Sequence, residues 1–161
     1  MVLSEYAARH PGYRFRVLAT DLSTEVLEEA RRAVYTSDVV APIPAALRTK
    51  YLMRSKSSDG RHRVVPELRK LVELRRLNLM DRNFQIPERM DAIFCRNVLI
   101  YFSRTTQRDL VMKLANQLRP NGLLLVGHTE TLHGMDLPLS QVAPSIYVKD
   151  GRQSRLKVLR R

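Results

Sequence analysis

The sequence predicts an α/β fold in which helices cover a parallel β-sheet. Apolar segments of strand length alternate with helical patterns along most of the 161 residues, and this order is typical of βαβ units. Two of these segments, DAIFC at residues 91–95 and GLLLV at 122–126, are apolar almost throughout. Such runs are typical of the strands of parallel sheets, which are buried on both faces.

The first predicted strand, Phe15–Ala19, has Asp21 at its tip and is followed by a helix. Ser23 is the expected N-cap of this helix, because its hydroxyl can accept a hydrogen bond from the first turn. The apolar residues of the helix share one face, which consists of Val26, Leu27, Ala30 and Ala33. A second long helix is expected over 103–118, in front of the stop signal Pro120-Asn121-Gly122.

The segment 37–70 interrupts this parallel pattern. A short helix is predicted to start near Pro44. The turn-forming stretch SKSSDGR joins YLMR to RHRVVPELR, and this arrangement predicts two antiparallel strands. We therefore expect a small antiparallel insertion subdomain at 37–70, within a main domain formed by residues 1–36 and 71–161.

Composition limits the kinds of partner and compartment. The formal net charge is +12, which indicates an acidic partner, although a solvated surface that keeps the protein soluble is the simpler interpretation. Aromatic residues are few and no nucleic-acid-binding motif is present, so we expect no nucleic-acid partner. No apolar run is long enough to cross a membrane, and the histidines lack metal-ligand spacing. The single cysteine, Cys95, predicts a reducing, cytoplasmic location.

Six segments carry a resemblance to a known family. They are ATDLSTEVLEEAR, YLMR, RLNLMDRNF, DAIFCRNVLIYF, TTQ and GLLLVGHTE, in this order between residues 14 and 150. Together they resemble the CheR family, the chemotaxis receptor glutamate O-methyltransferases. The resemblance implies a Rossmann-like class I methyltransferase sheet. It also implies S-adenosyl-L-methionine (AdoMet) as cofactor and S-adenosyl-L-homocysteine (AdoHcy) as product.

The chain departs from this family pattern at its beginning. Sheets of this class begin with a strand and a glycine-rich turn, whereas the six glycines here include no G-x-G. Aligned by its motifs, the chain begins in the helix after that turn. We therefore expect an N-terminally truncated AdoMet-binding domain whose sheet lacks its first strand. The two strands beside the gap would keep unpaired edges, which predicts a homodimer or a strand-swapped oligomer.

The resemblance places the cofactor at the carboxyl ends of the strands, where α/β sheets bind ligands. Asp21 can accept hydrogen bonds from both ribose hydroxyls, although an aspartate at the start of a helix is the simpler interpretation. Asn78 and Leu79 correspond to residues that lie against adenine, with turn formation as the alternative for Asn78. Asn97 and Val98 correspond to the segment that flanks the methionine part of the cofactor.

Two further residues are predicted near the methyl group that is transferred. Tyr101 is expected to orient the substrate carboxylate or to lie near the sulfonium, with plain packing as the alternative. Arg96 can neutralise the substrate, with a structural ion pair as the alternative. A carboxylate is ionised at neutral pH, so this reaction depends on alignment and needs no strong base. His128 and Glu130 are therefore expected to organise a loop.

Two functions stay open. The first is AdoMet-dependent methyl transfer to glutamate side chains on the acidic methylation helices of chemoreceptors, by an enzyme of which this chain is an incomplete or inactive fragment. The second is a non-catalytic basic interaction module derived from the methyltransferase scaffold. The absence of a glycine-rich turn favours the second function, whereas the retained site residues favour the first: Asp21, Asn78, Asn97 and Tyr101.

Overall fold

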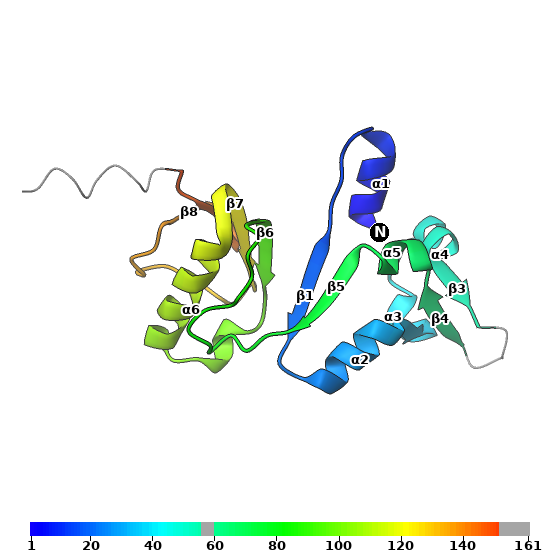
Figure 1. Cartoon of the computed structure of the whole chain (residues 1–161), viewed down its shortest axis with the longest axis horizontal. Coiled ribbons are helices and arrows are strands. Elements are labelled where there is room, and N and C mark those ends of the chain that lie inside the picture. The colour runs from blue at the N-terminus through cyan, green and yellow to red at the C-terminus, as the bar shows by residue number, and fades with distance from the viewer. Residues whose placement is uncertain (56–59, 152–161) are drawn as a thin grey trace, which may run out of the picture. The chain divides into compact units, whose positions relative to one another are not determined.

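The computed structural model describes residues 1–55 and 60–151. These residues form two compact units: the first unit, Met1–Asn78, and the second unit, which begins at Leu79. Each unit contains its own helices and sheets (Figure 1). Among the described helices, none combines the length and the apolar character that a membrane span requires.

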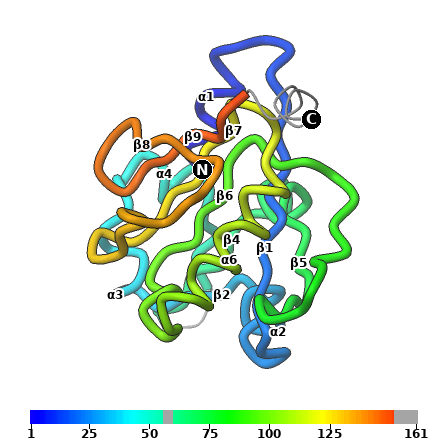
Figure 2. Tube along the Cα trace, turned by 90° about the vertical axis from the view of Figure 1, so that its left-hand side faces the viewer, coloured from blue at the N-terminus to red at the C-terminus, as the bar shows by residue number. Residues whose placement is uncertain are grey.

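The first unit contains the parallel strand pair β1 (Val17–Asp21) and β5 (Val72–Arg76). Their last residues, Asp21 and Arg76, lie opposite each other. Helix α2 (Thr24–Arg32) lies beside both strands, as Figure 1 shows and Figure 2 shows from the side. The predicted strand before Asp21 and the helix that follows it are therefore present.

Helix α2 begins where its sequence predicts. The Ser23 hydroxyl accepts a hydrogen bond from the Val26 amide at 3.3 Å, which confirms Ser23 as the N-cap. At the other end, Ala33 takes the left-handed conformation, with φ of 51°, and the helix stops. Strand β1 starts at Val17, slightly later than the predicted Phe15.

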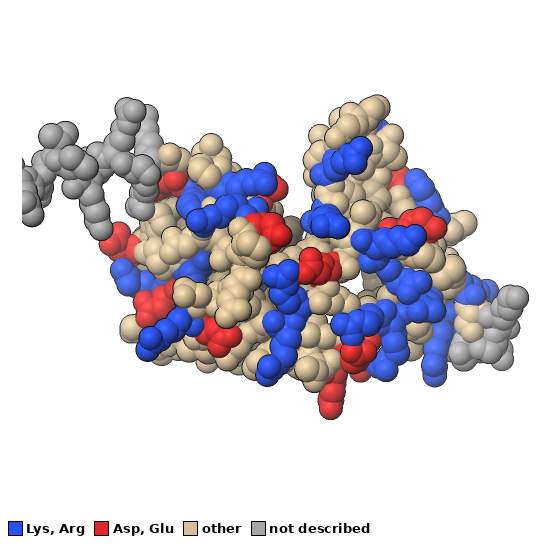
Figure 3. Space-filling model, viewed as in Figure 1, with Lys and Arg blue, Asp and Glu red and all other residues tan. Residues whose placement is uncertain are grey.

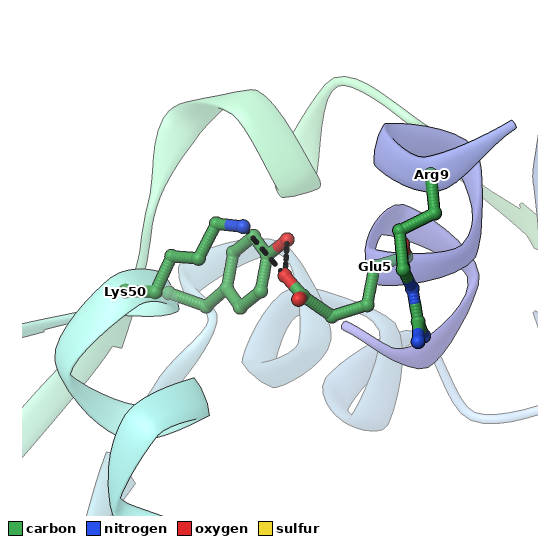
Figure 4. Close-up of polar contacts among 4 residues, drawn as sticks. Glu5, Arg9 and Lys50 are labelled. Carbon is green, nitrogen blue, oxygen red and sulfur yellow. Dashed lines mark hydrogen bonds and ion pairs between the residues drawn. The ribbon is translucent and has the colours of Figure 1, made fainter. Parts of the chain in front are cut away.

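Helix α1 (Val2–Arg9) is attached to helix α4 (Ala45–Tyr51) through one carboxylate. Glu5 Oε1 accepts hydrogen bonds from Lys50 Nζ and Tyr51 Oη, each at 2.6 Å (Figure 4). The hydrogen bond from Lys50, followed by the one from Tyr51, lowers the pKa of Glu5. These contacts join α1 to the part of the unit that contains the antiparallel strands.

A three-stranded antiparallel sheet in the order β2-β4-β3 completes the first unit. Its strands are β2 (Val34–Thr36), β3 (Leu52–Arg54) and β4 (Arg61–Val64), with the short helices α3 (Ser37–Val40) and α5 (Pro66–Arg69) beside them in the sequence. The predicted pairing of β3 with β4 is confirmed, and Pro44 is the N-cap of α4 as expected. Residues 56–59 of the predicted turn lie outside the described residues. Strand β2 was not predicted.

The second unit is built on a four-stranded sheet in the order β6-β7-β9-β8. Its strands are β6 (Met90–Cys95), β7 (Leu118–Val126), β8 (Leu139–Ala143) and β9 (Ile146–Lys149). β6 and β7 run parallel, as predicted, whereas β9 pairs antiparallel with both β7 and β8. The sequence analysis did not predict β8 and β9.

Helix α6 (Arg104–Gln117) packs against β7 and supplies much of the core of this unit. Its N-cap is Ser103, whose hydroxyl accepts a hydrogen bond from the Thr106 amide at 3.4 Å. The helix ends at Gln117, before the predicted stop signal, because the chain enters β7 at Leu118. The largest fully buried side chains of the unit are Leu99, Leu110, Val111, Leu118 and Leu124.

Strand β6 is not buried on both faces, contrary to the prediction. Phe94 is 71 % exposed, and Asp91 and Ala92 are exposed as well. Among the described strands, β6 pairs only with β7, and β1 pairs only with β5. The two strands therefore have the unpaired edges that the sequence predicts.

Candidate functional site

The residues predicted for the site lie at or just beyond the carboxyl ends of parallel strands, in two groups. Asp21 and Asn78 belong to the first unit. The other predicted residues belong to the second unit: Leu79, Arg96, Asn97, Val98 and Tyr101. The structure thus places Asp21 and Asn78 at the carboxyl ends of β1 and β5, and the segment 96–101 at the carboxyl end of β6.

Asp21 is the last residue of β1, and the two oxygens of its carboxylate differ in their contacts. Oδ1 accepts a hydrogen bond from the Ser23 amide at 2.8 Å, so the interpretation as a residue that starts the helix is correct. Oδ2 makes no hydrogen bond within the described part of the chain. The Leu77 amide donates to the Asp21 carbonyl at 2.9 Å, which places Asn78 beside the strand end. A carboxylate oxygen without a hydrogen bond can accept from hydroxyl groups such as those of a ribose.

In the second unit, the chain turns sharply after β6. Asn97 has φ of 58°, a left-handed conformation that asparagine tolerates better than most residues. A short 3₁₀-helix, Leu99–Tyr101, follows. Tyr101 is 79 % exposed, so its side chain does not have the packing role that was the alternative. Arg96 is exposed too, and none of the ion pairs among the described residues involves it.

Glu130 is buried beside this turn, with 7 % of its surface exposed. Oε1 accepts hydrogen bonds from the amides of Val98 at 2.8 Å and Leu99 at 2.7 Å. Oε2 accepts them from the amides of Asn97 at 3.0 Å and Gly127. Burial raises the pKa of the Glu130 carboxyl, but these four N–H groups outweigh burial and hold the pKa below its ordinary value of 4.5. The ionised carboxylate therefore ties the end of β7 to the turn after β6.

Gly127 leaves no room for a side chain beside this carboxylate. A Cβ atom at this position would lie 2.6 Å from Asn97 Oδ1 and 2.7 Å from Glu130 Oε2. Both distances are far shorter than a carbon and an oxygen tolerate without a bond. The glycine of the Gly-His-Thr-Glu motif is therefore required by the close approach of two strand ends.

Leu79 is held in place by a residue that the sequence analysis did not single out. Lys113 of α6 donates hydrogen bonds from Nζ to the carbonyl oxygens of Leu79 at 2.6 Å and Asp81 at 2.7 Å. The same ammonium lies 5.1 Å from the centroid of the Phe84 ring, within the range of a cation–π interaction. The only signal in the sequence was a charged residue within the apolar stretch of α6.

Cys95 has none of the properties of a catalytic thiol. Its side chain is buried, and burial, assisted by the negative charge of Glu130, raises the pKa of the thiol to about 11. The thiol is therefore protonated at neutral pH, whereas nucleophilic cysteines need a lowered pKa. No group of three residues that could hold a metal ion exists among the described residues.

Basic side chains gather on the first unit. Figure 3 shows Lys and Arg crowded over the part of this unit that contains the antiparallel strands. The exposed ones at 46–76 are Lys50, Arg54, Arg61, Arg63, Lys70 and Arg76. Lys56 and the basic residues of the tail from 152 onward lie outside the described residues. The described basic residues alone provide a surface suited to an acidic partner.

Residues 1–148 match the family described as CheR methyltransferase, SAM binding domain. The chain belongs to the CheR methyltransferase family. It is 38% identical over 151 residues to a chemotaxis protein methyltransferase of Borreliella burgdorferi, which covers 93% of this chain and 52% of that protein. It is 36% identical over 148 residues to one of Salmonella typhimurium, covering 91% and 51%. The chain spans about half the length of these curated relatives.

Among solved structures, the chain is similar to the glycopeptide N-methyltransferase MtfA complexed with S-adenosyl-L-methionine. The TM-score is 0.44 and the identity 17%, over 91% of this chain and 63% of that one. CheR membership confirms the resemblance inferred from the six segments, and with it the predicted class of α/β fold. The CheR match also includes every residue predicted for the site. The individual roles of these residues remain predictions.

Proposed function

We propose that this chain is the AdoMet-binding part of a protein-glutamate O-methyltransferase that acts on chemoreceptors. The observation that carries the proposal is the match of residues 1–148 to the SAM-binding domain of the CheR family. Both relatives described above are named chemotaxis protein methyltransferases. Residues 1–36 and 71–161 form the AdoMet-binding domain, and 37–70 form the insertion, a division supported by the antiparallel pairing of β3 with β4.

Each predicted residue has a distinct role toward the cofactor. In the first unit, Asp21 binds the ribose hydroxyls and Asn78 pairs with the edge of adenine. In the second unit, Leu79 covers the adenine ring, while Asn97 and Val98 flank the methionine part. The free Oδ2 of Asp21 supports the first of these roles, and the anchoring of the Leu79 carbonyl by Lys113 supports the role of Leu79.

The exposed residues of the second unit act on the acceptor. Bound AdoMet would supply an electrophilic methyl group for transfer to a carboxylate oxygen of the acceptor, with the electron pair of the carbon–sulfur bond left on sulfur. Tyr101 orients this carboxylate, and its exposed phenol is accessible to it. Arg96 reduces the repulsion among acidic groups of the substrate, since it is exposed and has no ion pair among the described residues. Alignment of this kind is a large source of rate enhancement.

The acceptors are glutamates on the acidic methylation helices of chemoreceptors. The basic surface of the first unit has the charge that complements such helices, and complementary charge accelerates and orients association. We place the protein in the cytoplasm, where a reducing environment suits a single buried thiol.

Calorimetric titration with AdoHcy tests the cofactor proposal, and Asp21→Asn is the informative variant. Asparagine keeps an oxygen acceptor for the Ser23 amide but removes the charge and the second acceptor. We expect AdoHcy to bind the full chain and the variant to bind about tenfold more weakly or worse, because a hydrogen bond to a charged group contributes about 1.5–3 kcal/mol. Free adenosine should lose affinity in the same variant.

Asp136→Asn is the matched control, because Asp136 is an exposed aspartate that does not lie at the strand ends where the predicted site residues are found. It should leave AdoHcy affinity unchanged. If the full chain binds no AdoHcy at millimolar concentration, the cofactor proposal is wrong and the non-catalytic basic module becomes the better description. Equal affinity of wild type and Asp21→Asn would remove Asp21 from the site.

We further propose that copies of the chain associate through the unpaired edges of β1 and β6. Each of these strands has a partner on one side only among the described strands, and unpaired backbone groups at such edges favour pairing with another chain. Size-exclusion chromatography with light scattering is expected to show a dimer or a larger closed oligomer. A monomer that persists as the protein concentration rises into the hundreds of micromolar would contradict this expectation.

A further inference from the structure

Two motifs of the sequence converge on one short segment of the second unit, residues 97–102. The Gly-His-Thr-Glu motif contributes Glu130, whose carboxylate accepts the N–H groups at the start of this segment. The Thr-Thr-Gln motif contributes Gln107, whose Nε2 donates to the carbonyl oxygens of Leu99 at 2.9 Å and Phe102 at 3.0 Å. One side chain therefore binds the N–H groups of the segment, and the other binds its carbonyl groups.

We propose that Glu130 and Gln107 are positioning residues that hold segment 97–102 in the shape that binds the methionine part of the cofactor. This inference rests on the proposed function, because it concerns how Asn97 and Tyr101 are presented. Neither positioning residue touches the cofactor. Both act through the backbone of the segment between them.

The chemistry of each side chain matches the groups that it contacts. Glu130 faces only donors, and an ionised carboxylate offers acceptors on both oxygens. Gln107 faces carbonyl oxygens and needs the two N–H donors of an amide. Exchanging the two functional groups, in Glu130→Gln and Gln107→Glu, keeps the size of each side chain but sets a donor against donors or an acceptor against acceptors.

The backbone hydrogen bonds within the segment hold only its later part, where the amides of Tyr101 and Phe102 donate to the carbonyl oxygens of Val98 and Leu99. Asn97 has a positive φ of 58°. The amides of residues 97–99 all donate hydrogen bonds to the Glu130 carboxylate, an arrangement like that of a backbone site for an anion. Gly127 donates a fourth N–H to Glu130 and allows the close approach that a larger residue would prevent. The Glu130 carboxylate is therefore the common anchor for both strand ends.

Hydrogen exchange on the full chain, followed by mass spectrometry without ligand, tests the positioning itself. In Glu130→Gln, the amides of residues 97–99 are expected to exchange about tenfold faster or more, the change that corresponds to one lost hydrogen bond to a charged group. Gln107→Glu should accelerate exchange across 99–102. Glu88→Gln and Asn116→Asp are matched controls, because both change an exposed side chain of the second unit, and should leave this segment unchanged.

Calorimetric titrations with AdoHcy and with adenosine separate positioning from general damage to the fold. Glu130→Gln and Gln107→Glu are each expected to weaken AdoHcy binding about tenfold while leaving adenosine binding unchanged, because adenosine lacks the methionine part. A fold defect would weaken both ligands. Such a result, or wild-type AdoHcy affinity in both variants, would overturn the inference.

Failure of the proposed function can be distinguished from failure of the positioning inference. If wild type binds neither AdoHcy nor adenosine, the proposed function fails together with the cofactor role of the segment. Hydrogen exchange would still test the hydrogen bonds that Glu130 accepts and Gln107 donates, since that measurement needs no ligand. Unchanged exchange of 97–102 in both variants would show that the two side chains do not hold the segment.

Discussion

Replacing Leu124 with alanine is expected to lower the free energy of unfolding of the second unit by about 2–5 kcal/mol, the usual cost of truncating a fully buried leucine. Leu124 has none of its surface exposed. It lies at the centre of the sheet, with Ile93 of β6 and Tyr147 of β9 as its register partners on either side. The lost side chain would leave a cavity that the paired strands cannot close.

Native-state hydrogen exchange of the full chain measures this loss, because peptides from β7 and β9 report on the second unit separately. Leu123→Ala is the matched control, since Leu123 is the neighbouring residue of β7 but is 37 % exposed. We expect the control to change β7 protection much less. Equal protection of β7 in Leu124→Ala and wild type would show that this position is not the centre of the core.

Replacing Glu130 with leucine is expected to destabilise the second unit by about 3 kcal/mol or more, because each buried donor left without an acceptor costs about 1–3 kcal/mol. Leucine is close to glutamate in size, so the change removes the acceptors and creates no large cavity. The N–H groups of Asn97, Val98, Leu99 and Gly127 would lose their partner. Urea denaturation followed by circular dichroism measures the difference.

The Glu130 carboxylate makes the free energy of unfolding of the second unit depend on pH. The pKa of Glu130 is lower in the folded chain than its ordinary value of 4.5, so its contribution is fully present above that value and is lost as the pH falls through the folded-state pKa. We expect the difference in unfolding free energy between wild type and Glu130→Leu to be wide at neutral pH and to narrow as the pH falls below 4.5. A gap that stays constant over this range would show that the charge of Glu130 makes no contribution.

Local signals explain which elements the sequence predicted correctly. Ser23 and Ser103 are caps that act within three residues, and the apolar spacing of α6 matches its buried face. Strands β8 and β9 escaped prediction because their turn contains Ser145 at φ of 61°, without the glycine that usually marks such a turn. The exposure of Phe94 escaped prediction as well, since an apolar residue does not reveal whether anything covers it.

The site was predictable in its residue types but not in its supporting contacts. The motif around Glu130 predicted a residue that organises a loop, yet three of its four partners are backbone amides more than 30 residues away. Backbone groups are the same at every position, so no residue type indicates which loop is held. Lys113 was missed for the same reason, because it binds the carbonyl oxygens of Leu79 and Asp81.

The attachment of α1 to α4 makes the first unit sensitive to ionic strength. Glu5 and Lys50 are joined by an ion pair whose partners are both accessible to solvent, and dissolved ions screen such pairs over about 10 Å at 0.1 M salt. Concentrated salt is therefore expected to weaken this ion pair, while the carboxylate of Glu130, shielded from solvent, keeps its contacts. Buffer composition becomes an experimental variable that acts more strongly on this exposed attachment than on the buried contacts of Glu130.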